Sequence, residues 1–203
     1  MVELHDLMKN RRSIREFIGD RSIEDKILKR VIDAPFLAPS AANIKGFNLL
    51  IVDEPDLKQK IRDLCEKGEY NWVFSQPTEI KESILSLPNY SFQKDFLTDA
   101  PILIIVSTDP ENPNVPYAVE SCWLAIAYML LEIENSELGS LTYTPSLIQT
   151  EKRNELNKIL NLSKEEIIQT IVPVGYFKEK PEAKTVEISD NVHLNQFRNP
   201  FSN

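Results

Sequence analysis

Three arginines and a serine lie within five consecutive residues near the start of the chain: Arg11, Arg12, Ser13 and Arg15. Guanidinium groups bind phosphate through paired charge-assisted hydrogen bonds, each contributing about 1.5–3 kcal/mol. A phosphate monoester carries up to about two negative charges, so two or three arginines match it well. The segment therefore suits a phosphate site, although a solvated basic turn would have the same composition.

Two further segments could contact a flat ring. The loop from Ala38 to Asn43 consists of small residues and ends in an amide, so backbone N–H groups are open to a ligand. Thr142 and Thr144 occupy alternate positions of an expected strand, which places both hydroxyls on one face. An ordinary connecting loop and ordinary β-branched strand filling are the alternatives for these two segments.

Several classes of site lack sequence support. The chain contains no G-x-G-x-x-G or G-x-x-x-x-G-K-[ST] motif for nucleotides and no G-x-S-x-G or H-E-x-x-H motif for hydrolysis. Cys65 and Cys122 do not have C-x-x-C spacing, and His5 lies far from His193 in the sequence. We therefore expect no metal site.

Composition places the chain among ordinary globular proteins. It has 203 residues, 42% of them hydrophobic and 27% charged, which suits one domain over residues 1–203. The net charge of −8 argues against nucleic-acid or anionic-membrane partners. The longest apolar run, 121–131, is shorter than the roughly 20 residues that span a bilayer. With few cysteines and a polar start, these features predict a cytoplasmic protein.

Hydrophobic periodicity predicts interleaved helices and strands, as in an α+β or α/β arrangement. Helices are expected over 3–10, 22–37, 55–67, 116–136 and 151–160, and strands over 47–52, 101–107, 141–144 and 167–176. The stretch 68–96 is aromatic and irregular in pattern, and 177–203 is a polar tail that must dock on something.

Taken together, these segments resemble the FMN-dependent nitroreductase superfamily. The resemblance rests on R-R-S-x-R at 11–15, A-P-S-x-x-N at 38–43, D-A-P-I-L-I-I-V at 99–106 and V-P-V-G-Y at 172–176. The T-x-T-P at 142–145 and the length of the 60–100 region are most similar to the iodotyrosine deiodinase branch. The resemblance implies a nitroreductase-like α/β sandwich: a mostly antiparallel sheet flanked by helices, with the tail 177–203 exchanged across a homodimer.

The resemblance also implies an FMN site at the subunit interface. Arg11, Arg12, Ser13 and Arg15 would bind the FMN phosphate and the ribityl chain or ring carbonyls, with Lys184 as a basic tail residue at the phosphate. Pro39, Ser40 and Ala41 of the other subunit would pack on the isoalloxazine, with Asn43 closing the motif. Thr142 would lie near the flavin N5 with Thr144 beside it, and the Ala42 backbone N–H would face the substrate. The apolar helix 117–131 is expected to form the dimer core or to be buried within one subunit.

A mobile lid is implied over 68–96. The deiodinase branch holds its substrate's zwitterion with a glutamate, a tyrosine and a lysine from this lid. Ungapped counting from the 60–62 segment to Ala100 places the glutamate at Glu69 and the lysine at Lys94. The tyrosine position falls on Val73, which has no hydroxyl.

The implied activity is that of an FMN-dependent oxidoreductase. NAD(P)H would reduce the flavin and leave, and an electron-poor nitroaromatic, quinone-like or conjugated small molecule would then be reduced in ping-pong turnover. Reductive dehalogenation of a halogenated tyrosine is the alternative activity. A non-catalytic flavin-binding sensor and an acidic interaction domain without flavin are further alternatives.

Overall fold

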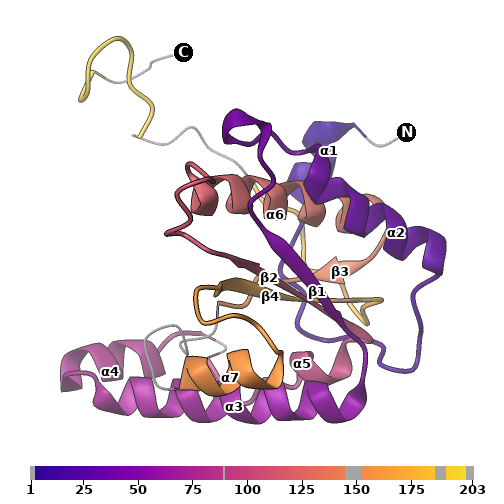
Figure 1. Cartoon of the computed structure of the whole chain (residues 1–203), viewed down its shortest axis with the longest axis vertical. Coiled ribbons are helices and arrows are strands. Elements are labelled where there is room, and N and C mark those ends of the chain that lie inside the picture. Colours follow the sequence, from indigo (N-terminus) through magenta and orange to yellow (C-terminus); the bar gives the residue numbers. More distant parts are fainter. Residues whose placement is uncertain (1–2, 89, 145–151, 186–190, 200–203) are drawn as a thin grey trace.

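An antiparallel sheet forms the middle of the molecule (Figure 1). The computed structural model describes residues 3–88, 90–144, 152–185 and 191–199, and within them the sheet order is β1-β2-β4-β3. The strands are β1 (Asn48–Val52), β2 (Ile102–Thr108), β3 (Gly139–Ser140) and β4 (Ile167–Gly175). Every position of β2 is buried, as expected for a continuous apolar run covered on both faces.

Helices cover both faces of this sheet (Figure 1). One side carries α1 (Leu4–Asn10), α2 (Asp25–Asp33) and α6 (Ala118–Asn135), and the other carries α3 (Pro55–Ser75), α4 (Thr78–Leu85), α5 (Phe96–Asp99) and α7 (Lys152–Ile159). Short 3-10 turns lie at Ala34–Leu37 and Ala41–Asn43. The predicted sandwich of helices and antiparallel sheet is therefore confirmed.

Side chains of β2 alternate between two hydrophobic cores. Leu103 and Ile105 pack in the core on the α3 side, whereas Ile104 and Val106 pack in the core on the α6 side. This alternation follows from the two-residue period of a strand. The sheet is thereby packed against a hydrophobic core on each face.

The region expected to be irregular from residue 68 is instead mostly helical. Helix α3 runs on to Ser75, and α4 follows after Pro77. A contact between residues four apart supports the extension, because the Tyr70 and Phe74 rings stack with their centroids 4.4 Å apart. The aromatic content that suggested irregularity therefore lies along a helix face.

The strand expected over 141–144 is interrupted. β3 covers only Gly139–Ser140, and the pairing with β4 resumes at the bridge between Tyr143 and Ile171. The same register would place Leu141 opposite Pro173, which has no N–H to donate to the ladder. Thr142 therefore lies between two anchored points without being a strand residue itself.

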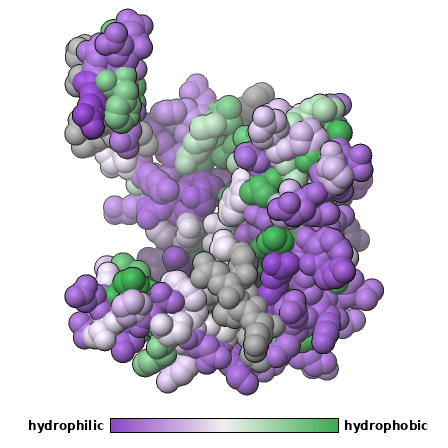
Figure 2. Space-filling view, turned by 60° about the vertical axis from the view of Figure 1, so that its left-hand side comes forward, coloured by the Kyte–Doolittle hydropathy of each residue, from purple (hydrophilic) through white to green (hydrophobic). Residues whose placement is uncertain are grey.

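The N-terminal arm (residues 11–18) extends the sheet edge. Ser13 forms a parallel bridge with Ser140, and the Ile14 N–H donates to the Ser140 carbonyl at 2.9 Å. The chain after β4 then runs back along the arm, with the Lys184 N–H donating to the Lys9 carbonyl at 3.1 Å. The 191–199 segment stands apart from the body in Figures 1 and 2. Exchange of the tail across a dimer stays a prediction.

Within the described ranges, no helix combines the length and apolar character needed to cross a membrane. The same residues contain no group of three or more histidine, cysteine, aspartate or glutamate side chains arranged to hold a metal ion.

Candidate functional site

One cavity of about 380 Å³ gathers residues from the arm, α3, the 90–96 segment and the chain after β3. We call it the central cavity. Its lining residues are Arg15, Glu69, Tyr90, Ser91, Gln93, Lys94, Asp95, Phe96, Leu141, Thr142 and Tyr143. Two predicted cofactor residues, Arg15 and Thr142, therefore share a cavity with two predicted substrate residues, Glu69 and Lys94.

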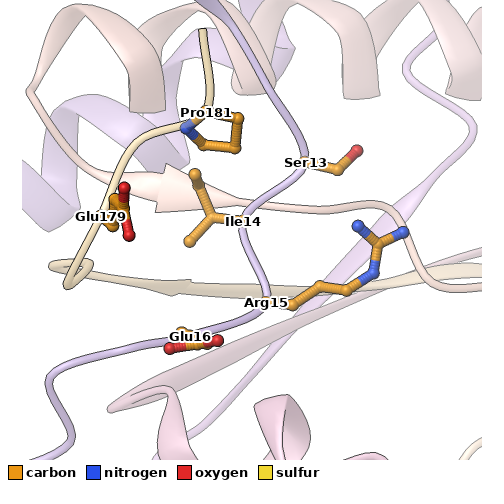
Figure 3. Close-up of a pocket in the computed structure, with 6 residues that line it drawn as sticks. All are labelled: Ser13, Ile14, Arg15, Glu16, Glu179 and Pro181. Atoms are coloured by element: carbon orange, nitrogen blue, oxygen red, sulfur yellow. The ribbon is translucent and has the colours of Figure 1, made fainter. Parts of the chain in front are cut away.

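The arm brings Arg15 to Thr142. Because Ser13 is bridged in parallel to Ser140, the residues two positions further along each segment, Arg15 and Thr142, also come close. Figure 3 shows the Ser13 and Arg15 side chains on one side of the arm and Ile14 on the other. Ser13 and Arg15 also line a second cavity, of about 350 Å³, so Arg15 borders both.

Glu69 and Lys94 form an ion pair at the central cavity. Their Oε2 and Nζ atoms are 3.0 Å apart, and the side chains are only 12% and 7% exposed. The Tyr143 hydroxyl donates to the same Glu69 oxygen at 3.2 Å, and Lys94 Nζ also donates to the Ser91 carbonyl. A buried charge is tolerated when it is paired and hydrogen-bonded, so this pair depends on its partners.

Two phenols face this pair. Burial raises the pKa of Tyr143 far above its usual value, and the neighbouring Cys65 thiol and Glu69 carboxylate raise it further. Burial, followed by Glu69, also raises the pKa of Tyr90. Both hydroxyls therefore stay protonated at neutral pH and can act as hydrogen-bond donors.

The arginines of the arm do not all meet at one point. Arg11 lines a smaller cavity, of about 210 Å³, with Met8 and the α6 residues Ala127, Leu130 and Leu131. Arg12 donates through Nη1 to the carbonyl of Glu182 in the tail. Since Lys184 bonds to Lys9 through its backbone, the tail brings its basic residue alongside the arm. A shared phosphate for these residues stays a prediction.

The loop from Ala38 to Asn43 is pinned but lies outside the central cavity of its own chain. Lys45 Nζ donates to the Ala38 carbonyl at 2.7 Å and the Ser40 hydroxyl at 3.2 Å, and the Ala41 N–H donates to Ser121 Oγ at 3.2 Å. Pro39 therefore lies between two anchored residues. The expectation that this loop reaches a site on a second copy stays a prediction.

Two residues of this loop have left-handed backbone conformations. Ala42 has φ 52° and Asn43 has φ 58°. Such values cost a residue with a Cβ about 1–2 kcal/mol, and they persist where the surroundings impose them. One of these two residues, Ala42, is the residue whose backbone N–H was predicted to face the substrate.

Two predicted residues have other roles in the described structure. Val73 is fully buried and does not line the central cavity. The Thr144 hydroxyl donates to the Gln169 carbonyl at 3.3 Å, which engages it with β4. Of the two threonines, Thr142 alone lines the cavity.

Tyr143 and Tyr90 were not singled out from the sequence. Strand alternation could have indicated Tyr143, because it predicts that the residue between Thr142 and Thr144 points to the opposite face from the two threonines. No sequence spacing indicates that Tyr90 lies beside Glu69, since the two are joined only through the fold.

Comparisons with known proteins agree with this fold. The family model described as Nitroreductase family matches residues 8–176. An iodotyrosine deiodinase of Thermotoga neapolitana is 33% identical over 97% of this chain and 100% of its own length. The chain belongs to the nitroreductase family.

Solved structures agree with that assignment. A crystal structure of oxidized iodotyrosine deiodinase bound to FMN and 3-iodo-L-tyrosine is 32% identical, with a TM-score of 0.82 over 96% of this chain and 100% of that one. A nitroreductase with bound FMN from Desulfitobacterium hafniense shares the fold, with 16% identity, a TM-score of 0.75 and coverage of 97% of this chain and 100% of that one.

Proposed function

We propose that this protein is an FMN-dependent reductase that removes halogen from a halogenated tyrosine. The observation that carries the proposal is the central cavity, in which Arg15 and Thr142 lie with the Glu69–Lys94 pair. The similarity to iodotyrosine deiodinases supports it and favours this activity over general nitroaromatic reduction.

The residues present suit a flavin. Arg15 offers a guanidinium to a ring carbonyl, Thr142 offers a hydroxyl, and Ser13 lies on the same side of the arm as Arg15 (Figure 3). Arg11, Arg12 and Lys184 would provide further positive charge for the phosphate. When bound, FMN would supply the electrons for reduction of the substrate, with NAD(P)H as their expected source.

The Glu69–Lys94 pair suits a zwitterionic amino acid. An ammonium group can replace Lys94 at Glu69 while a carboxylate replaces Glu69 at Lys94, so every buried charge keeps a partner. A ligand with only one of these charges would leave one protein charge uncompensated. The pair therefore favours amino acids over the corresponding amines or acids.

The reaction would replace a carbon–halogen bond by a carbon–hydrogen bond. It consumes two electrons and one proton per substrate and releases halide. The Glu69–Lys94 pair, which we call the substrate clamp, would hold the substrate ring beside Thr142. The Ala42 N–H of a second copy would donate a hydrogen bond to the substrate.

The proposal includes a homodimer. One face of α6 packs on the sheet, whereas Trp123, Leu124 and Tyr128 on its other face are 39%, 45% and 42% exposed. Apolar side chains gathered on an open helix face mark an interaction surface. A second copy is the expected occupant, because the loop from Ala38 to Asn43 lies outside the central cavity of its own chain.

A general NAD(P)H-dependent reduction of nitroaromatic, quinone-like or conjugated molecules is the second candidate. Val73 favours it, because this position lacks the phenol of the deiodinase clamp. A flavin-binding sensor without turnover is a further possibility. These functions are distinguished by which ligand perturbs the bound flavin and by whether halide is released.

The test is a titration of the purified, FMN-loaded protein. We expect 3-iodo-L-tyrosine to quench flavin fluorescence and, under reducing conditions, to release iodide. Glu69→Gln and Lys94→Met should weaken quenching at least tenfold, whereas Lys67→Met at an exposed position of α3 should not. A response to a nitroaromatic but not to iodotyrosine would support the second candidate. Failure to take up FMN would refute both.

A further inference from the structure

We infer that Tyr143 supplies the phenol of the substrate clamp in this chain, in place of the lid position occupied by Val73. It acts as a positioning and specificity residue through Glu69. The inference rests on the proposed function, because it concerns recognition of the amino-acid head at that site.

The contacts on Glu69 define this role. Tyr143 Oη donates to Glu69 Oε2 at 3.2 Å, and Lys94 Nζ lies 3.0 Å from the same oxygen. Tyr143 and Lys94 thus meet the same carboxylate oxygen. A substrate ammonium can approach a carboxylate that is already held in place, which reduces the cost of ordering it on binding.

The backbone of Tyr143 is hydrogen-bonded to β4. Its N–H donates to the Ile171 carbonyl at 2.9 Å, and its own carbonyl accepts from the Ile171 N–H at 2.8 Å. Thr170 Oγ1 donates to that carbonyl at 3.1 Å. The phenol is therefore tied to β4 through the backbone.

The ring itself is also held. Phe96 meets it edge to face with ring centroids 5.4 Å apart. This packing needs only the aromatic ring, whereas the contact with Glu69 needs the hydroxyl. Replacement of tyrosine by phenylalanine therefore separates the two roles.

Val73 cannot take over this contact. It has no donor, it is fully buried in α3, and it does not line the central cavity. The phenol that contacts Glu69 therefore comes from Tyr143, next to Thr142. Because Thr142 and Tyr143 are adjacent, the phenol that meets Glu69 is fixed relative to the flavin-side residue.

The discriminating experiment compares Tyr143→Phe with Tyr70→Phe, a lid tyrosine that is 51% exposed. Each FMN-loaded variant is titrated with 3-iodo-L-tyrosine and with its des-amino analogue, which keeps the ring and the carboxylate. We expect Tyr143→Phe to raise Kd for the amino acid about tenfold, since hydrogen bonds to charged groups contribute about 1.5–3 kcal/mol. Kd for the des-amino analogue should change less than about twofold on the same basis, because no ammonium meets Glu69. Tyr70→Phe should behave as wild type.

Three results would overturn the inference: no change in Kd for the amino acid, an equal loss for both ligands, or a loss of FMN affinity in Tyr143→Phe. Equal loss would indicate a structural role only. A wild-type protein that binds FMN but neither ligand would refute the proposed substrate.

If the wild-type protein binds neither ligand, hydrogen exchange without substrate still tests whether Tyr143 positions Glu69. Hydrogen exchange across α3 should be faster in Tyr143→Phe and in Glu69→Gln, and no faster in the double variant than in either alone. Exchange in Tyr143→Phe identical to wild type would show that Tyr143 does not position Glu69, whatever the substrate.

Discussion

Charged side chains that are buried in the described structure are held by carbonyl oxygens or by opposite charges. Lys58, 7% exposed, donates to the carbonyls of Ala100 at 2.7 Å and Thr98 at 3.2 Å, where α5 ends and β2 begins. Burial lowers the pKa of Lys58, while Asp53 and Asp99 oppose that shift. The lysine thus holds the junction that leads from Lys94 into the sheet.

Removal of this amine should destabilise the protein. We expect Lys58→Met to lower the free energy of unfolding by about 2–3 kcal/mol, because buried carbonyls lose a charged donor. Chemical denaturation measures the change. Lys60→Met, at an exposed position of the same helix, is the matched control and should stay within about 0.5 kcal/mol of wild type. Equal effects of the two substitutions would contradict the assigned role of Lys58.

Among the elements, the edge formed by β3, the arm and the start of the tail positions the cofactor-side residues. A Cβ on Gly139 would lie 2.9 Å from Ile14 of the arm and 2.9 Å from Phe177 of the tail. Only a glycine lets both segments approach β3 this closely. The same approach brings Arg15 beside Thr142.

Gly139→Ala should therefore affect both the edge and the flavin. Overpacking at this point should cost about 1–3 kcal/mol of stability. We also expect FMN affinity to fall about tenfold, a change of about 1.4 kcal/mol, because Arg15 is displaced with the arm. Calorimetry of the flavin-free protein and fluorescence titration with FMN separate the two effects. Wild-type FMN affinity in a destabilised variant would show that the arm's position does not govern binding.

At the scale of the whole molecule, the described residues leave apolar side chains exposed on the outer face of α6 and on the 191–199 segment, among other places. In the 191–199 segment, Phe197 is 79% exposed and Leu194 is 48% exposed. That segment projects as a separate lobe in Figure 2. Both features suit a chain whose exposed apolar side chains are covered by a second copy, which would also complete the proposed flavin site.

A charge on the α6 face should break this assembly. We expect Leu124→Glu to sediment as a monomer and to lose most bound FMN, since a buried unpaired carboxylate is strongly unfavourable at an interface. Leu85→Glu places the same charge on α4 at a similar exposure, 41% against 45%, and should leave the assembly intact. A dimeric, FMN-loaded Leu124→Glu variant would exclude this face as the interface.

Local sequence patterns determined much of the architecture. The apolar runs at 47–52, 101–107 and 167–176 predicted three buried strands, because strands covered on both faces need continuous apolar side chains. The apolar stretch within 116–136 likewise predicted α6. Residue types and spacing indicated the arginine segment and the small-residue loop as candidate site residues, whereas Glu69 and Lys94 were predicted only through the resemblance to the family.

Only the tertiary structure decided how these parts meet. The helical extension of α3 depends on contacts four residues apart, which the breakers Pro77 and Pro88 obscured in the sequence. The interruption after β3 depends on Pro173 lying opposite Leu141, a partner more than thirty residues away. The contact between Tyr143 and Glu69 spans 74 positions and exists because α3 and β4 pack on one core. A local pattern indicates whether each residue is buried, whereas contacts between residues far apart in the sequence depend on how the whole chain packs.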